Sequence, residues 1–269
     1  MSTQLSWDRA GSGEPVLLLH GIGTTREDFW ALRPALEAAY DVLAVDLPGH
    51  GDSPALSERP TIGAVTDVIE ADLDALGMGR VHVLGNSLGA RIALELAQRD
   101  RALSVVAIAP SGLNVLPERI YQGAAMSTLR LVMSILHPAL GPLVHFPAGR
   151  AVLLMGLRSQ PWLASAVEAR ALLEGFGESE DFWRLLYWGI LADVPTGFGD
   201  VRCPVILAQG TADVIGSGQT PRYLLAVPGA SFQHLFGAGH APQSDAPGSI
   251  LRLVRQATRR AAALSTATC

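Results

Sequence analysis

Short runs of apolar residues recur along the chain, each bounded by glycine, proline or charged residues. They occupy residues 16–19, 42–45, 81–84, 105–108 and 205–208. Continuous apolarity over so few residues is typical of strands that are covered on both faces. These runs are therefore predicted to be the buried strands of one sheet.

Helical periodicity fills the stretches between several of these strands. Residues 88–99 place Leu88, Ile92 and Leu96 on one stripe, and residues 62–76 also have helical spacing. Strands that alternate with helices indicate βαβ units. The chain is therefore predicted to form an α/β fold, with a mostly parallel central sheet flanked by helices.

The alternation of strands and helices stops after Pro110. Residues 114–198 show helical patterns, clearest in residues 126–136 and 162–173, and no evident buried strand. Prolines punctuate this region, as expected where short helices are joined by turns. We interpret it as a helical insertion between two strands.

The strand pattern resumes with residues 205–208, and alternation in residues 231–236 predicts a last strand. Two chain segments would then form one sheet domain around the insertion. The predicted division is a core of residues 1–113 and 199–269, with an inserted helical unit of residues 114–198.

The composition fits this organisation. Of 269 residues 49% are hydrophobic and only 17% charged, so the chain can bury a large core and still line an apolar pocket. The net charge is −5 and no basic run occurs, which argues against nucleic acid as a partner. The two cysteines, Cys203 and Cys269, have neither metal-binding nor disulfide-framework spacing, so no metal is expected.

The chain begins without the apolar segment of a secretory signal, and it has no uninterrupted apolar run of about 18 residues. We therefore expect no membrane span and a cytoplasmic location. A small apolar molecule is the expected partner, and both a monomer and a homodimer fit the sequence.

The segment Gly85–Gly89 reads G-x-S-x-G and lies between a predicted strand and a predicted helix. A sharp strand-to-helix turn needs small flanking residues because its backbone is strained and crowded. Such a turn exposes the serine oxygen above the sheet and places the helix N-terminus beside it. Ser87 is therefore the candidate nucleophile.

A serine hydroxyl needs a base, and the chain offers seven histidines. His240 follows the last predicted strand directly, and active-site loops gather at the carboxyl ends of parallel strands. His82 lies inside a predicted strand, where a core role fits better, and His137 and His145 lie in the helical insertion. His240 is therefore the predicted base.

The base needs a carboxylate to hold its second ring nitrogen. Asp213 comes just after the strand at residues 205–208 and gives the chain order serine, aspartate, histidine. Asp193 and Asp200 precede that strand, which places them away from its carboxyl end. Asp213 is the predicted third member.

The tetrahedral intermediate needs hydrogen-bond donors for its oxyanion. The backbone N–H of Leu88, next to Ser87, is one candidate, and that of Ile22, after another buried strand, is the second. His20 in the same loop is interpreted as structural, because one base suffices for the triad.

These motifs, in this order and spacing, resemble the α/β-hydrolase superfamily from about residue 14 to residue 255. The resemblance implies that the turn from Asp46 to Ser53 is structural, with Asp46 and His50 bonded to backbone. In the final motif Asp245 stands where the family often has Glu. The residues that carry the resemblance are His20–Gly23, Asp46–Ser53, Gly85–Gly89, Asp213 and His240.

The resemblance also implies that residues 114–198 are a helical cap that covers the nucleophile and shapes substrate choice. The region is rich in methionine and aromatic residues, which favours an apolar acyl or aromatic substrate. Burial in the cap's own core is the alternative for each of them. The predicted pocket residues are Gly21, Asn86, Met126, Trp162, Trp183 and Trp188.

The predicted activity is hydrolysis of a carboxylic ester through an acyl-enzyme, without a cofactor. The Gly85–Asn86–Ser87 turn resembles that of hydrolases that cleave carbon–carbon bonds in ring-fission products, in which an Asn also precedes the serine. For that reaction Arg184 of this chain is the candidate to bind a substrate carboxylate, and a solvated or cap-stabilising Arg184 is the alternative. Lactonase, thioesterase and perhydrolase activities use the same triad. A non-hydrolytic cyclase or ligand-binding receptor is the alternative of another class.

Overall fold

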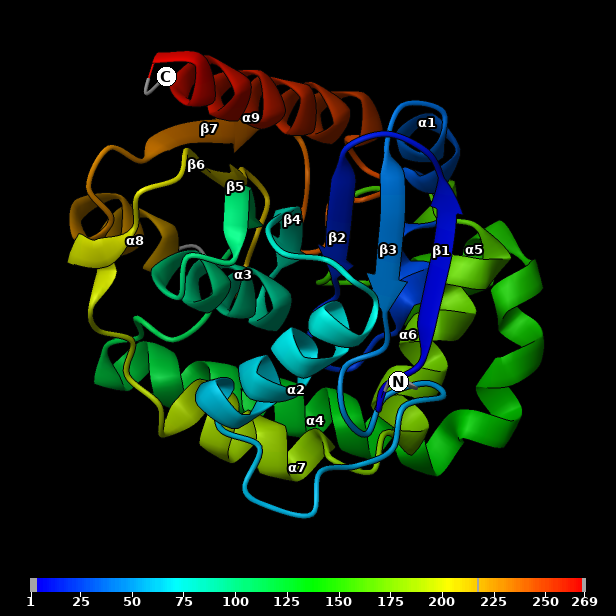
Figure 1. Ribbon diagram of the computed structural model, residues 1–269. Coiled ribbons are helices and arrows are strands. Elements are labelled where there is room, and N and C mark those ends of the chain that lie inside the picture. Colours follow the sequence, from blue (N-terminus) through cyan, green and yellow to red (C-terminus); the bar gives the residue numbers. More distant parts are fainter. Residues whose placement is uncertain (1–3, 217, 268–269) are drawn as a thin grey trace.

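A computed structural model describes residues 4–216 and 218–267, and its centre is a seven-stranded sheet (Figure 1). The strand order is β1-β3-β2-β4-β5-β6-β7, with β1 antiparallel to β3 and every other neighbouring pair parallel. The predicted mostly parallel α/β sheet is thereby confirmed. The strands are β1 (Trp7–Gly11), β2 (Pro15–Leu19), β3 (Asp41–Val45), β4 (Val81–Asn86), β5 (Ala102–Ile108), β6 (Val205–Gly210) and β7 (Ser231–Leu235).

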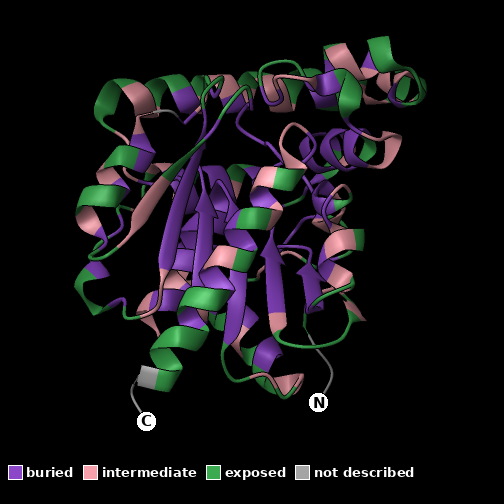
Figure 2. Ribbon diagram, turned by 90° about the horizontal axis from the view of Figure 1, so that it is seen from above, coloured by how far each residue is buried: buried purple, intermediate pink, exposed green. Residues whose placement is uncertain are grey.

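The central strands are buried on both faces because alternate side chains point to opposite sides of the sheet. Leu17 and Leu19 of β2 belong to one hydrophobic cluster, while Val16 and Leu18 belong to the other. Figure 2 shows the strands buried and the exposed residues on the surrounding helices and loops. Because both faces of β2 to β6 are buried, the sequences of these strands are mostly apolar.

Two groups of helices cover the two faces. Residues of α2 and α3 belong to the cluster of Leu17, and residues of α1 and α9 to the cluster of Val16. Figure 1 shows α9 above β5 and β7, and α2 and α3 below β4 and β5, so the two groups lie on opposite sides of the sheet. The helices of the sheet domain are α1 (Arg33–Glu37), α2 (Ile62–Ala75), α3 (Leu88–Gln98), α8 (Gln219–Ala226) and α9 (Pro247–Ala267).

The segment between β5 and β6 is helical, and its described residues contain no named strand. It begins with a longer helix than the pattern at residues 126–136 predicted. The helix expected at residues 162–173 begins later, because Ser165 caps it with Glu168 as reciprocal partner and Pro161–Leu163 forms a separate short turn. The helices are α4 (Leu116–Leu140), α5 (Pro147–Leu153), α6 (Ala166–Glu178) and α7 (Phe182–Leu185), which continues into a π-helical turn at Leu186–Leu191.

One helical stretch in the described residues, Leu116–His145, is long and apolar enough to cross a membrane by length and composition, and 11% of its apolar window is buried. Arg130 and His137 interrupt the apolar residues of this stretch, so the absence of a long uninterrupted apolar run did not predict it. A single stretch of this kind is weak evidence for a membrane span.

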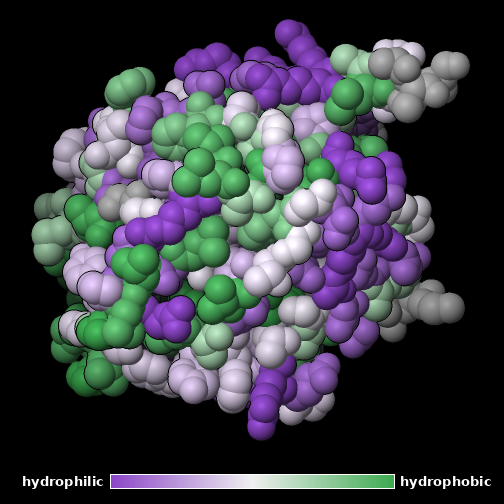
Figure 3. Space-filling view, turned by 90° about the vertical axis from the view of Figure 1, so that its left-hand side faces the viewer, coloured by the Kyte–Doolittle hydropathy of each residue, from purple (hydrophilic) through white to green (hydrophobic). Residues whose placement is uncertain are grey.

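The surface carries both hydrophilic and hydrophobic side chains. In Figure 3 hydrophilic side chains gather along the upper edge, where Figure 1 places α9, and hydrophobic side chains lie mostly below that edge. Cys203 is a free thiol, and Cys269 lies outside the described residues.

Candidate active site

Ser87 occupies a strained turn between the end of β4 and the start of α3. Its φ is +53° and its ψ −110°, a conformation rare for a residue with a side chain. A Cβ on Gly85 would overlap the carbonyl oxygen of Gly89, and one on Gly89 would overlap that of Leu19. Both glycines are thus required by close packing, as the G-x-S-x-G pattern predicted. The turn is held by the backbone N–H of Ser87, which donates to Ile108 O at 2.8 Å.

His240 and Asp213 lie side by side after β7 and β6. The Nδ1 of His240 is 2.9 Å from the Oδ2 of Asp213, and both residues are buried. The backbone N–H groups of Ile215 and Gly216 donate to the Oδ1 of Asp213 at 2.7 and 3.0 Å. The side-chain amide of Gln209 donates to Oδ2. These donors fix the carboxylate so that one oxygen faces the imidazole.

This pairing shifts the pKa of both residues. Burial, the largest effect, lowers the pKa of His240, but the charge and hydrogen bond of Asp213 and the charge of Asp28 outweigh it and raise that pKa above 6.5. Burial alone would raise the pKa of Asp213, but His240 and the backbone donors hold it below 3.8. The imidazolium is therefore stabilised next to an ionised carboxylate.

The backbone of the histidine loop (residues 236–242) is anchored on two sides. The side-chain amide of Asn86 donates to the carbonyl of His240 at 3.0 Å. On the other side Ala241 N–H donates to Leu157 O at 2.9 Å. The carboxylate of Asp245 accepts from Gly239 N–H at 2.8 Å. The ring of His240 is thus positioned by the turn at Ser87 and by the helical segment together.

Ser87 and His240 line one small buried cavity of about 20 Å³. Gly21, Asn86 and Met126, three of the predicted pocket residues, also line it. Of the other lining residues, Leu172, Phe176 and Ile190 come from the segment between β5 and β6. Ser87 and His240 therefore face the same cavity.

The three tryptophans predicted for the pocket do not line this cavity. Trp162 and Trp183 are exposed, and Trp188 stacks under the guanidinium of Arg59 at 4.7 Å. The inward faces of their segments are taken by other apolar residues, which leaves the indoles on the outside. The prediction was wrong for Trp162, Trp183 and Trp188.

Arg184 does not point into the cavity either. Its guanidinium donates to the carbonyls of Leu56 and Glu58 and to the carboxylate of Asp181. It therefore ties α7 to the loop before α2, and the structure gives it no contact with the site. The substrate-binding role suggested for it has no support.

The loop after β2 lies against Ser87. A Cβ on Gly21 would be 3.4 Å from the Cβ of Ser87, so this backbone approaches the serine closely. His20 accepts from Leu47 N–H at 2.9 Å and donates to Gly21 O at 2.7 Å. Burial lowers the pKa of His20 to about 4, which keeps it neutral. His20 therefore holds the loop that carries Ile22, as expected.

His50 supports the same loop from the turn after β3. It accepts from Gly23 N–H at 3.1 Å and donates to Pro48 O at 3.1 Å. Burial lowers its pKa to about 3. The structural role that the resemblance implied for His50 agrees with these contacts.

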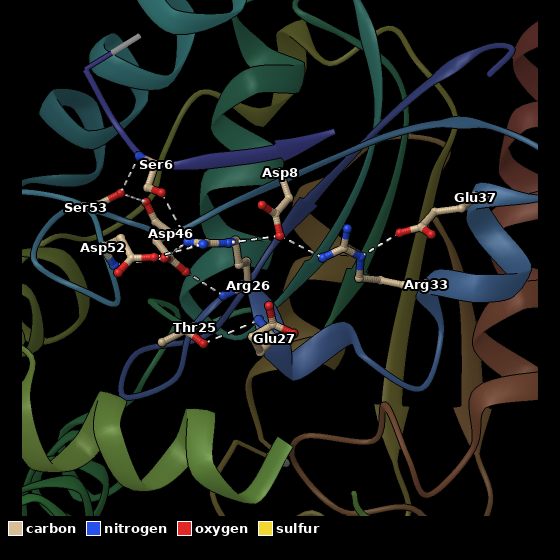
Figure 4. A network of polar contacts seen from close by, with 10 residues as sticks. All are labelled: Ser6, Asp8, Thr25, Arg26, Glu27, Arg33, Glu37, Asp46, Asp52 and Ser53. Atoms are coloured by element: carbon tan, nitrogen blue, oxygen red, sulfur yellow. Dashed lines mark hydrogen bonds and ion pairs between the residues drawn. The ribbon is translucent and has the colours of Figure 1, made fainter. Parts of the chain in front are cut away.

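Asp46 is the centre of the network drawn in Figure 4. It accepts from the backbone N–H of Arg26 at 2.8 Å and of Asp52 at 3.0 Å, and it pairs with the Arg26 guanidinium. Arg26 also contacts Asp8 of β1 at 3.2 Å. The network therefore joins the loops after β2 and β3 to the edge strand.

A buried ionic cluster at the cavity was not foreseen from the sequence. Asp28, which lines the cavity, pairs with Arg158 at 2.5 Å and accepts from Gln243 at 2.7 Å. Arg158 also faces Glu168 of α6 at 3.4 Å. Burial raises the pKa of Asp28 to about 6, although the charge of Arg158 opposes it. This cluster joins the helical segment to the sheet domain.

No group of three or more His, Cys, Asp or Glu side chains suited to a metal ion occurs among the described residues. The described site presents the Ser87 hydroxyl, the His240 imidazole held by the Asp213 carboxylate, and the backbone N–H groups at the start of α3.

Residues 16–252 match the model of the Alpha/beta hydrolase family. The chain belongs to this family and is a hydrolase. It is 31% identical to the pimeloyl-[acyl-carrier protein] methyl ester esterase of Neisseria meningitidis serogroup B, over 84% of this chain and 86% of that protein.

A second relative is similar over a shorter stretch. The dihydrolipoyllysine-residue acetyltransferase component of the acetoin cleaving system of Pseudomonas putida is 35% identical over 40% of this chain, which spans only 31% of that protein. Among solved structures the enol-lactonase of Burkholderia xenovorans has a TM-score of 0.74 at 19% identity, over 94% of this chain and 95% of that one. At this identity the structural likeness concerns the fold.

Proposed function

We propose that the protein hydrolyses carboxylic esters through an acyl-enzyme. The observation that carries the proposal is that Ser87 and His240, with Asp213 bound to His240 at 2.9 Å, belong to one buried site. The esterase of Neisseria meningitidis, similar over most of both chains, supports ester hydrolysis as the reaction.

In the proposed reaction Ser87 attacks the ester carbonyl as its proton passes to His240. Asp213 stabilises the imidazolium that forms. The N–H groups of Ile22 and Leu88 donate to the oxyanion. The alcohol leaves with the proton from His240, and the same base then activates the water that releases the acid.

We further propose that residues 114–198 act as a cap on a core formed by residues 1–113 and 199–269. Support comes from the cap side chains that line the cavity, among them Met126 and Phe176. The contacts of Arg158 with Asp28 and Ser244 hold this cap on the core.

Cleavage of carbon–carbon bonds has weaker support. The Asn86 amide is engaged with the carbonyls of Ile108 and His240, and Arg184 is engaged outside the cavity. Neither is free to bind a substrate carboxylate. Lactones and thioesters would use the same triad and therefore belong in the substrate panel.

The test is hydrolysis of p-nitrophenyl esters from acetate to laurate, together with labelling by a fluorophosphonate probe. Ser87→Ala should lose both activity and labelling. Ser111→Ala is the matched control, because Ser111 is also buried nearby and its hydroxyl has no hydrogen-bond partner. Activity that persists in Ser87→Ala, or wild-type protein that hydrolyses no ester, would refute the proposal.

A further inference from the structure

The space beside Ser87 is too small for a whole substrate. The cavity holds about 20 Å³, and a site for a single water needs roughly 10–15 Å³. An ester carbonyl fits such a space after small adjustments, whereas a hydrocarbon chain does not. The rest of the substrate must therefore extend beyond this cavity.

A larger groove lies between α4 and α5, on the side of the cap. Its volume is about 590 Å³, within the range of roughly 300–1,000 Å³ usual for small-molecule sites. The described residues that line it include no charged side chain, and most are aliphatic. Among them are Ala125, Met126, Thr128, Leu157 and Ile215.

The groove and the cavity share part of their walls. Met126, Leu157 and Ile215 line both spaces. Leu157 is fixed by its carbonyl, which accepts from Ala241 of the histidine loop at 2.9 Å, and Ile215 donates its N–H to Asp213 at 2.7 Å. Met126 has neither tie to the catalytic loops, and its unbranched thioether side chain changes rotamer easily.

We propose that this groove binds the unbranched acyl chain of the substrate, and that Met126 moves to let the chain pass from Ser87 into it. This inference rests on the proposed ester hydrolysis and specifies its substrate class. The preferred substrates are esters of straight-chain, medium-length carboxylic acids. The alcohol portion stays on the other side of the scissile bond.

The lining also specifies what the far end of the chain must be. With no charged residue along the groove, a terminal carboxylate would be moved out of water without a partner, which is unfavourable. Monocarboxylic esters are therefore preferred to half-esters of dicarboxylic acids of equal length. A chain that fills the groove gains about three- to fourfold in kcat/KM for each buried methylene.

The test uses p-nitrophenyl esters of increasing length with two groove variants, Ala125→Phe and Thr128→Phe. Ala139→Phe is the matched control, because Ala139 is exposed on the same helix and does not line the groove. The wild type should favour laurate over acetate. Each groove variant should lower the laurate-to-acetate ratio of kcat/KM by at least about tenfold, whereas the control retains it.

A binding measurement separates this proposal from the reaction itself. Dodecanoate should bind Ser87→Ala in calorimetry, and adding Ala125→Phe should weaken that binding by about tenfold or more, while Ala139→Phe leaves it unchanged. Ester hydrolysis without this binding, or with an unaltered length profile in both groove variants, would overturn the groove assignment and leave the proposed function standing.

Two other outcomes are equally decisive. Dodecanoate binding that Ala125→Phe weakens, in a protein that cleaves no ester, would support the groove and refute the proposed function. A dimer in size-exclusion chromatography that Ala125→Phe dissociates would show that a second copy occupies the groove, which overturns the proposal.

Discussion

The side-chain amide of Asn86 donates a hydrogen bond to the backbone carbonyl of His240, 3.0 Å away. Asn86 immediately precedes Ser87, so this one contact joins the turn that carries the proposed nucleophile to the loop that carries the proposed base. The same amide reaches Ile108 O at 3.3 Å on the neighbouring strand. The distance between the serine and the imidazole therefore depends on a side chain that does not itself react.

Asn86→Ala should consequently reduce kcat by about tenfold or more with a smaller change in KM, because the histidine loop loses its anchor. It should also lower the free energy of unfolding by about 1–3 kcal/mol, the usual effect of leaving a buried carbonyl without its donor. Steady-state kinetics and urea unfolding measure the two effects. Gln98→Ala, which removes an amide hydrogen bond to the carbonyl of Thr196 outside the cavity, is the control and should keep kcat. Stability loss without a fall in kcat would contradict the positioning role.

Asp213→Asn should reduce kcat by roughly 10³–10⁴-fold, because an amide does not stabilise the imidazolium and can favour the wrong tautomer of His240. Asp200→Asn is the matched control, since Asp200 is exposed and precedes β6. Burst kinetics with p-nitrophenyl acetate would locate the loss in acylation. Comparable losses in the two variants would argue against Asp213 as the partner of His240.

The pH dependence of kcat/KM should report the raised pKa of His240. His240 must be neutral to act as the proposed base, so activity should be low in acid and rise as pH increases through a value above 6.5. Asp28→Asn removes a negative charge that raises this pKa, so the acid limb should move to lower pH. A profile from about pH 5 to about pH 9 measures the shift.

Glu178→Gln is the control for that shift, because Glu178 is an exposed cap carboxylate that pairs with His137 rather than His240. Its profile should match the wild type. An acid limb that Asp28→Asn leaves in place, or moves to higher pH, would mean that the charge of Asp28 does not reach the base.

Most of the strands predicted from the sequence are those whose side chains are buried on both faces, whereas β7, which is largely half-buried or exposed, was predicted from its alternation. The strands β2 to β6 are continuous apolar runs, and each of Ser87, Asp213 and His240 follows one strand within a few residues. By contrast β1, with sequence WDRAG, pairs with one neighbour at the sheet edge and is half exposed, so it has no such run.

The residues of the site that the sequence did not predict are those that pair with partners far away along the chain. Asp28 and Arg158 are 130 positions apart, and nothing near either residue indicates the other. The prediction for the three tryptophans was wrong for a different reason. Helical spacing predicts that a helix has an apolar face, but it does not predict which residues of the helix point toward the cavity. In the helical segment between β5 and β6 the inward positions are occupied by residues such as Met126 and Phe176.

Arg158→Met should destabilise the protein, and more so at high pH. The substitution leaves Asp28 and Glu168 buried without their cation, a change that typically costs about 3–5 kcal/mol. The folded pKa of Asp28, about 6, already lies above its ordinary 3.8, so its ionisation lowers stability as pH rises between these values. Without Arg158 the pKa of Asp28 rises further, so the loss in free energy of unfolding at about pH 8 should exceed the loss at about pH 5.

Urea unfolding of the wild type and of Arg158→Met at both pH values measures this difference. Arg150→Met, which loses a hydrogen bond to Val144 O, is the control. An equal loss at the two pH values would show that Asp28 is not the group whose charge Arg158 compensates.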